Sequence, residues 1–578
     1  MLLIKKIIKL AVVGIKKIAE ISIIVVLLLI NLTKIIKKTC KIMYTNYMKT
    51  FKFAGIILLS VLLFSCSNYS RGRLWGGNYL FRSASMPENG IYEEIYEIEE
   101  EVFDPSNFDQ IKDNPFRLVN DYPLSTFSID VDTAGYTITR RYIERNQLPP
   151  TSAIRIEELI NYFDYDYAPP KDDKPFAVHT EVAPAPWNPD RLLARIAIKG
   201  KEFPAALRPR VNLVFLIDVS GSMDSPTRLP LVIESLKLLV NELNAADKIA
   251  ICVYASAAGV VLPPTDCGDK EKIISALQKL KAGGSTAGGQ GIQQAYSLAQ
   301  ENFLPDAVNR VIICTDGDFN VGITNRGDLS ALITEKAKTG VYLTVLGFGM
   351  DNFQDGTLKQ LSSKGNGNYG YIDTIEEAQK ILVKQLSGTL ITIANDVKIQ
   401  VDFNPANAGA YRLIGYENRL LRDEEFNDDS ADAGDIGAGH TVTAFYEIIK
   451  PDDPFLNTLP RRDPSKYGPL VHEGYISQYA NELMSVKIRY KLTPHTESEL
   501  INFPVQISSI RKAGEESLDF RFASSVAGFG MLLRDSSHKG NASYASIINL
   551  AQGSIGNDLW NFRRNFVEMV KKASVINR

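Results

Sequence analysis

Cysteine, histidine and tryptophan are scarce in this sequence, with five, five and three residues among 578. Five cysteines in so long a chain exclude a scaffold held together by disulfides, because such scaffolds pair cysteines densely. No histidine falls between residues 209 and 388. That stretch therefore lacks the base that usually activates a serine nucleophile, and we expect the protein not to be an enzyme.

A basic surface is also missing from most of the chain. Residues 1–65 carry eleven lysines, no arginine and one acid, a balance of +10, whereas the whole chain has a formal net charge of −3. The remaining residues, 66–578, therefore carry −13. Because phosphate contacts need a basic surface, we expect no nucleic-acid partner. A chain of 578 residues, 45% of them apolar, should form about three or four globular units.

The beginning of the chain predicts export and lipid attachment. Residues 48–65 combine two early lysines with an apolar stretch too short to span a bilayer comfortably, which is typical of a signal peptide. The segment ends in Leu-Phe-Ser-Cys, which resembles the lipobox of bacterial lipoproteins, although Phe64 is bulkier than that box usually allows. The resemblance implies that Cys66 is lipidated and becomes the mature N-terminus. The expected location is the cell envelope, anchored in the outer membrane on its periplasmic or surface side.

The segments on either side of this signal have unusual compositions. Isoleucine and lysine account for twenty-one of residues 1–47. This part is either an upstream extension, with Met48 as the true start, or a membrane helix around residues 18–32. Residues 66–112 mix Ser, Asn, Gly and Arg with an acidic run and show no sustained periodicity. This composition predicts a disordered tether.

Between residues 209 and 388 apolar strands alternate with amphipathic helices. The run Val211–Ile217 is typical of a strand buried on both faces. The segment Leu229–Leu243 places its apolar residues on one helical stripe. Further strands and helices follow in alternation, ending with a helix expected at 375–386. The pattern predicts an α/β fold, a doubly wound and mainly parallel sheet with a Rossmann-like arrangement.

Two flanking regions, 113–205 and 389–578, contain short alternating stretches. Strands are expected at 177–182 and 192–198 in the first region. In the second, strands at 397–401, 411–420, 441–449 and 483–490 look like a small antiparallel sheet, and a helical tail follows at the C-terminus. Two or so strands make only a marginal sheet in water. We therefore predict that both sets pair into one β-rich body, with the α/β domain inserted between them. The two ends of the inserted domain should then lie close together.

Oxygen-bearing side chains follow the ends of several predicted strands. Because the carboxyl ends of parallel strands meet at one edge, these side chains should converge there. The candidates are Asp218, Ser220, Ser222, Thr286 and Asp316. All are hard oxygen donors, and the direct candidates are mostly neutral hydroxyls. Such a set suits Mg²⁺, with Mn²⁺ or Ca²⁺ as alternatives.

The order Asp-x-Ser-x-Ser, then Thr, then Asp closely resembles the metal-ion-dependent adhesion site of von Willebrand factor type A domains. The resemblance implies that Ser220 and Ser222 ligate the metal directly and that Thr286 does so directly or through water. It implies that Asp218 and Asp316 hold waters and orient hydroxyls. An acidic side chain of a partner protein would then complete the coordination.

The likeness extends over about residues 113–573. Segments such as STFSIDVDTAGYTITRRYI, DAGDIGAGHTVTAFYEI and FRFASSVAGFGMLLR resemble the flanking regions of a bacterial von Willebrand factor type A lipoprotein family. The expected function is a cell-envelope lipoprotein with a Mg²⁺-dependent, protein-binding domain of the adhesion type. The alternatives are an assembly factor or scaffold for an envelope complex and a metal-dependent hydrolase.

Overall fold

The computed structural model describes residues 111–203, 208–255, 258–284, 288–317, 326–349, 355–463, 476–492 and 497–576. The signal segment, Cys66 and Thr286 lie outside these ranges, so the expectations for them stay predictions. Within the described ranges, no helix has both the length and the apolar character that crossing a bilayer requires.

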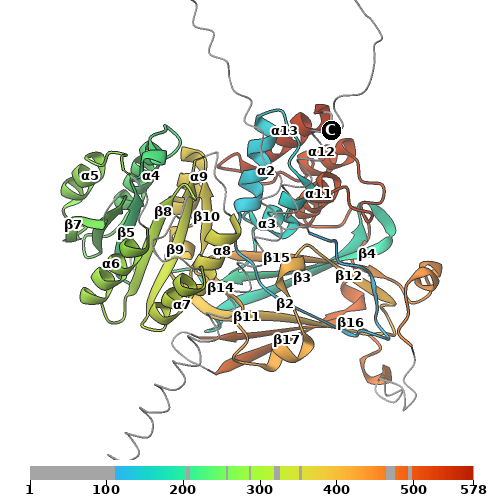
Figure 1. Ribbon diagram of the computed structural model, residues 1–578. Helices are drawn as coiled ribbons and strands as arrows, with labels where there is room; N and C mark the ends of the chain where they lie inside the picture. Colours follow the sequence, from blue (N-terminus) through green and yellow to red (C-terminus); the bar gives the residue numbers. More distant parts are fainter. Residues whose placement is uncertain are drawn as a thin grey trace, which may run out of the picture. The chain divides into compact units, whose positions relative to one another are not determined.

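The middle of the chain forms an α/β unit around one sheet, ordered β10-β9-β8-β5-β6-β7 (Figure 1). Neighbouring strands are parallel except β6 and β7. The strands are β5 Val211–Asp218, β6 Lys248–Tyr254, β7 Ala258–Asp266, β8 Val308–Thr315, β9 Val341–Phe348 and β10 Tyr369–Ile372. The helices are α4 Leu229–Glu242, α5 Lys270–Gln278, α6 Gly288–Glu301, α7 Arg326–Ala337, α8 Asp355–Lys364, α9 Ile375–Gln379 and α10 Leu386–Leu390.

Strand β5 shows why this sheet is covered on both faces. All of its residues are buried, and successive side chains of a strand point to opposite faces. Leu213 and Phe215 belong to the apolar core that includes α4, whereas Val214 and Leu216 belong to the core that includes α6. The prediction of a doubly wound, mainly parallel α/β sheet is confirmed.

The regions before and after the α/β unit form two antiparallel sheets. The first has the order β1-β12-β15-β4-β3 and the second β13-β2-β11-β16-β17, with β14 paired to β11. The early strands are β1 Arg117–Leu118, β2 Leu124–Ser128, β3 Phe176–Ala185 and β4 Asn188–Gly200. The late strands are β11 Thr392–Phe403, β12 Ala410–Ile414, β13 Leu420–Leu421, β14 Gly434–Gly437, β15 Thr441–Ile449, β16 Glu482–Lys491 and β17 Ser498–Gln506.

Each of these sheets joins strands from both sides of the α/β unit. In the first sheet β15 pairs with β4, and in the second β11 pairs with β2. The prediction of one β-rich body around an inserted domain is confirmed. The single small sheet expected after residue 389 is wrong in detail, because its strands divide between two sheets.

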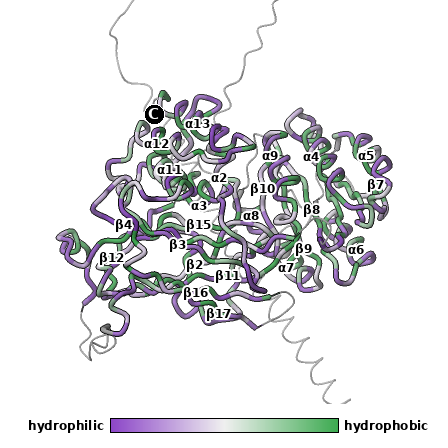
Figure 2. Tube along the Cα trace, turned by 180° about the vertical axis from the view of Figure 1, so that it is seen from behind, coloured by the Kyte–Doolittle hydropathy of each residue, from purple (hydrophilic) through white to green (hydrophobic). Residues whose placement is uncertain are grey.

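Helices from both ends of the body cover the first sheet (Figure 1). They are α2 Ala134–Glu144, α3 Ile156–Asn161, α11 Leu518–Leu533, α12 Tyr544–Gln552 and α13 Phe562–Val575. One apolar core joins these helices to side chains of the first sheet such as Leu193 and Phe445, and another lies between the two sheets. Figure 2 shows hydrophobic segments along the inner strands and hydrophilic ones along outer loops.

The two connections to the α/β unit meet at Gly437–Gly439. The Gly439 N–H donates to the carbonyl of Lys201 at 3.0 Å, and the Ala438 N–H donates to the carbonyl of Ile391 at 2.8 Å. One partner precedes β5 and the other follows α10, so the ends of the inserted unit lie beside the same short segment. This arrangement is the one that an insertion requires.

Three local expectations are corrected by the structure. Strand β3 continues through Pro184 to Ala185, beyond the expected end at residue 182. Because β3 is an edge strand, it tolerates a proline, which has no N–H to donate to a neighbouring strand. The strand expected at 411–420 ends at Ile414, because Gly415 and Tyr416 adopt positive φ angles. The helix expected at 375–386 contains a π-helical segment, Lys380–Lys384.

Candidate functional site

The Asp-x-Ser-x-Ser segment lies directly after β5, at the carboxyl edge of the parallel sheet. The Ser220 N–H donates to Asp218 Oδ1 at 2.8 Å, and the Oγ atoms of Ser220 and Ser222 are 3.0 Å apart. A short 3₁₀ helix, Gly221–Met223, turns the chain so that the two hydroxyls lie together. The loop therefore gathers one carboxylate and two hydroxyls at the end of a buried strand.

The neighbouring strand β8 brings the second acid to the same edge. Asp316 follows β8 directly, and its negative charge helps to raise the pKa of Asp218. Burial is the largest cause, and together the effects raise that pKa to about 6 despite hydrogen bonds from Ser220. Arg228 lies beside both loops: it donates to the carbonyl of Ser222, and its Nη1 is 3.6 Å from Asp316 Oδ2.

Four of the five candidates thus converge, and the fifth lies outside the described residues. The chain leading to Thr286 runs beside the serine loop, since Gly221 N–H donates to the carbonyl of Gly284 at 2.9 Å. The Gly283 N–H likewise donates to the carbonyl of Val219 at 2.8 Å. Two buried carboxylates beside neutral hydroxyls form an oxygen donor set that fits a small hard cation. Sequence reasoning missed Arg228, because an arginine before a helix is a common feature.

Comparisons with known proteins agree with this geometry. The family model described as von Willebrand factor type A domain matches residues 212–385, and one described as von Willebrand factor matches residues 102–195. A third, described as uncharacterized protein YfbK, C-terminal, matches residues 388–576. The uncharacterized protein YfbK of Escherichia coli (strain K12) is 41% identical over 476 residues, which cover 81% of each chain. The chain belongs to the YfbK family.

More distant similarities cover parts of the chain. The human inter-alpha-trypsin inhibitor heavy chain H2 is 26% identical over 183 residues, which cover 29% of this YfbK-family chain and 19% of that protein. A solved von Willebrand factor type A protein from Catenulispora acidiphila is 17% identical, with a TM-score of 0.38 and coverage of 70% of this chain and 91% of that one. Type A domains generally mediate protein–protein interactions, so this YfbK-family chain carries a domain of that class.

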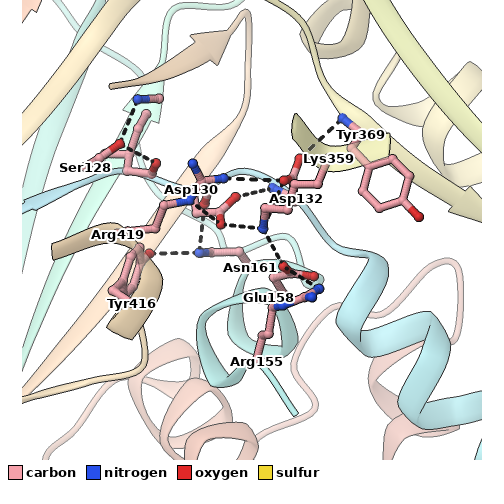
Figure 3. Close-up of polar contacts among 12 residues, drawn as sticks. Ser128, Asp130, Asp132, Arg155, Glu158, Asn161, Lys359, Tyr369, Tyr416 and Arg419 are labelled. Atoms are coloured by element: carbon pink, nitrogen blue, oxygen red, sulfur yellow. Dashed lines mark hydrogen bonds and ion pairs between the residues drawn. The ribbon is translucent and has the colours of Figure 1, made fainter. Parts of the chain in front are cut away.

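A second polar cluster lies where the α/β unit meets the β-rich body (Figure 3). Asp130 and Asp132 follow β2, and Glu158 lies on α3; their carboxylate oxygens lie within 4.8 Å of one another and all three residues are buried. Lys359 of α8 enters this group from the α/β unit. Its Nζ lies 2.9, 3.1 and 2.6 Å from the oxygens of Asp130, Asp132 and Glu158.

Three converging carboxylates could in principle hold a metal ion, but here a protein cation lies among them. Besides the Lys359 ammonium, Arg419 donates from Nε to Asp130 Oδ2 at 2.9 Å. The cluster is therefore an acidic socket for Lys359, and these contacts give no support for a second metal centre. Sequence reasoning did not find this socket. The alternating Ser-Ile-Asp-Val-Asp pattern shows the two aspartates, but nothing in it indicates a lysine 229 residues later.

Further ion pairs extend this interface around α2. Arg140 contacts Asp373 at 2.5 Å and Glu377 at 3.1 Å, both on the α/β side. Its neighbour Arg141 donates to the hydroxyl of Tyr371 at 2.9 Å. These partners are mostly buried, so the contact between the two parts of this YfbK-family chain includes ion pairs that are shielded from water. Buried ion pairs are costly to break, because the remaining partner is left unpaired.

Protonation of buried acids should make the stability of this protein depend on pH. Burial is the main cause that raises the pKa values of Asp132 and Asp373 to about 6 and those of Glu157 and Asp435 to about 7. An acid whose pKa is higher in the folded protein than in the unfolded chain contributes stability at low pH. This contribution is fully present when the pH lies below the pKa of the unfolded chain, near 4, and it is lost as the pH rises through the pKa of the folded protein. His440 and His538 oppose the trend, since burial lowers the pKa of His440 to about 4 and also lowers that of His538.

These four acids, together with Asp218, outnumber the two opposing histidines. We therefore expect the protein in EDTA to be more stable at pH 6 than at pH 8. The free energy of unfolding should be higher at pH 6 by about 1–3 kcal/mol, and the unfolding temperature should be higher as well. Calorimetry at the two pH values measures the difference. Asp132→Asn should reduce it, and a stability that is flat or rising toward pH 8 would contradict the prediction.

Proposed function

We propose that this protein binds a partner protein through a Mg²⁺ ion held by its type A domain. The convergence of Asp218, Ser220, Ser222 and Asp316 at the carboxyl edge of the sheet supports the proposal. Ser220 and Ser222 would hold the ion directly, and Thr286 would do so directly or through water. The two aspartates would orient hydroxyls and waters around it.

The donor set explains why such an ion would favour an acidic partner. Its direct protein ligands would be neutral hydroxyls, and the two nearby carboxylates would act through hydrogen bonds. A bound Mg²⁺ would therefore keep much of its positive charge and attract an external Asp or Glu carboxylate. Arg228 contacts the Ser222 carbonyl and faces Asp316, so it would hold the two loops next to each other.

Removing one hydroxyl should weaken metal binding without unfolding the protein. Ser220→Ala deletes a proposed ligand with little change in volume. We expect Mg²⁺ or Mn²⁺ affinity to fall about 10–100-fold, and Asp316→Asn to act in the same direction, since outer partners of a metal site typically contribute that much. Titration calorimetry of the chain that begins at residue 67 measures the affinity.

Ser225→Ala is the matched control for this experiment. It lies in the same loop, and its Oγ contacts Thr227 Oγ1 at 3.3 Å instead of the proposed ligands. Circular dichroism should be unchanged in all variants, because the sheet depends on its apolar strands. Absence of divalent-ion binding by the unmodified chain at millimolar concentration, or equal binding by Ser220→Ala, would show the proposal to be wrong.

Capture of partners from an envelope extract separates this function from a scaffold role. We expect a partner to be retained in Mg²⁺ and released by EDTA, with Ser220→Ala failing to retain it in either condition. A partner that stays bound in EDTA and binds Ser220→Ala equally well would favour an assembly factor or scaffold for an envelope complex.

We also propose that Cys66 anchors the protein in the outer membrane through lipid. The signal-like segment at 48–65 and the acidic, aperiodic tether that follows support this proposal. Labelled palmitate should enter the protein in bacterial cells, and Cys66→Ala should abolish the labelling. Deletion of residues 1–47 should leave expression and localisation unchanged if Met48 is the start. Undiminished labelling of the Cys66→Ala variant would exclude this anchor.

A further inference from the structure

A cavity of about 400 Å³ lies between α11 and α12, far in the sequence from the metal-site residues. The turn between β3 and β4 contributes Trp187 to its lining. Its volume falls in the range of about 300–1,000 Å³ that is typical of small-molecule sites. Its walls combine apolar side chains, such as Ile547 and Leu550, with small polar ones, such as Ser524.

Small residues on α11 leave this space open. Ser524 and Gly528 face the cavity one helical turn apart, and both line it. A Cβ added at Gly528 would meet Ile547 and Trp187 atoms only at 3.6–3.8 Å, which is ordinary van der Waals contact. The glycine is therefore not required there by close backbone packing. A larger residue could occupy this position, and it would fill part of the cavity.

The polar groups of the cavity favour a negatively charged ligand. Arg521 lines it, and its guanidinium makes no hydrogen bond, ion pair or ring contact with the residues that the structure describes. Trp187 also lines it, is only 3% exposed, and its indole N–H has no hydrogen-bond acceptor among the described residues. No acidic residue belongs to the lining. An unpaired guanidinium in a lining without acidic residues favours an anion that accepts hydrogen bonds.

We infer that this cavity binds a small organic carboxylate with an apolar body. The carboxylate pairs with the Arg521 guanidinium, and the apolar part packs against Ile547, Leu550 and the indole of Trp187. Charge-assisted hydrogen bonds contribute about 1.5–3 kcal/mol. Loss of the guanidinium should therefore weaken binding about 10–100-fold. The site does not depend on the metal centre, so each proposal can fail without the other.

Decanoate is a suitable probe, with 1-decanol as its uncharged counterpart. Titration calorimetry on the chain that begins at residue 67 should show decanoate binding at micromolar to submillimolar concentration and decanol binding at least tenfold weaker. Arg521→Met should weaken decanoate binding at least tenfold. Arg564→Met is the matched control, because Arg564 is an exposed arginine of α13 outside the lining, and it should leave binding unchanged.

Filling the cavity tests its volume separately from its charge. Gly528→Leu should abolish decanoate binding while circular dichroism is retained. Asn549→Trp fills the space from the exposed side of α12 and should have the same effect, so a folding defect in one variant does not decide the outcome. Absence of decanoate binding at millimolar concentration, equal binding by Arg521→Met, or unchanged binding by both filled variants would overturn the inference.

Discussion

Replacing Lys359 by methionine should lower the free energy of unfolding by about 3–5 kcal/mol, the usual cost of removing one partner from a buried ion pair. The Lys359 ammonium contacts three buried carboxylates, on Asp130, Asp132 and Glu158. Without it, Arg419 is the main cation left beside the aspartates. The carboxylates would then repel one another in a site with little access to water. Chemical denaturation of the two proteins at pH 8 measures the difference.

Lys364→Met is the matched control on the same helix. Lys364 pairs with Asp432 at 2.8 Å, but both side chains are well exposed, at 40% and 53%. Exposed pairs contribute only about 0–1 kcal/mol, so this variant should unfold nearly as the unmodified protein does. Equal effects of the two substitutions would contradict the interpretation of the socket as a buried site.

The pH dependence of Lys359→Met distinguishes lost charge pairing from lost packing. Burial and the charge of Asp130 raise the pKa of Asp132, whereas Arg419 and Lys359 hold the pKa of Asp130 below its usual range against the effect of burial. Without Lys359 all three acids should bind protons more readily. The loss in unfolding free energy caused by Lys359→Met should therefore be smaller at pH 5 than at pH 8. A loss that is constant over this range would indicate that only packing was lost.

Gly437→Ala should lower the free energy of unfolding by about 3 kcal/mol or more. This is at or above the upper end of the usual effect of inserting extra atoms into a well-packed site. A Cβ at this position would lie 1.9 Å from the carbonyl oxygen of Gly388, which is a backbone atom and cannot turn aside. The clash lies where both connections to the α/β unit meet. We therefore expect loss of cooperative unfolding between the two parts as well as lower stability.

Gly259→Ala is the control, because nothing lies within 4 Å of a Cβ added there. Gly259 belongs to the edge strand β7, and this substitution should leave stability nearly unchanged. Denaturation followed by both near-ultraviolet and far-ultraviolet circular dichroism measures stability and cooperativity together. If the Gly437→Ala protein were as stable as the Gly259→Ala protein, the packing around Gly437, where the two connections meet, would be looser than the structure indicates.

Patterns within short segments were enough to predict the α/β unit. Strands such as Val211–Asp218 are buried on both faces, so they are apolar along their whole length and recognisable without any partner. The same pattern located Asp218, Ser220, Ser222 and Asp316, because the end of each parallel strand lies at one known edge. The insertion could be predicted from a simple count, since the two strands expected before the α/β unit, at 177–182 and 192–198, are too few for a stable sheet.

Other features depend on pairings that leave little local trace. The division of the late strands between two sheets depends on which early strand each one meets, as when β11 pairs with β2 across more than 260 residues. The edge strand β7 was missed because its exposed side chains make its pattern weak. The cavity beside Arg521 depends on the spacing of two helices, which composition does not indicate.

The two charged sites show this difference most clearly. The candidate metal centre is visible in the sequence because its residues follow the buried strands at fixed short distances. The acidic socket joins Asp130, Glu158, Lys359 and Arg419, which are separated by up to 289 residues. Each of them alone looks like an ordinary surface charge. Only the docking of α8 against the β-rich body removes them from water together, and this shared desolvation makes their pairing strong.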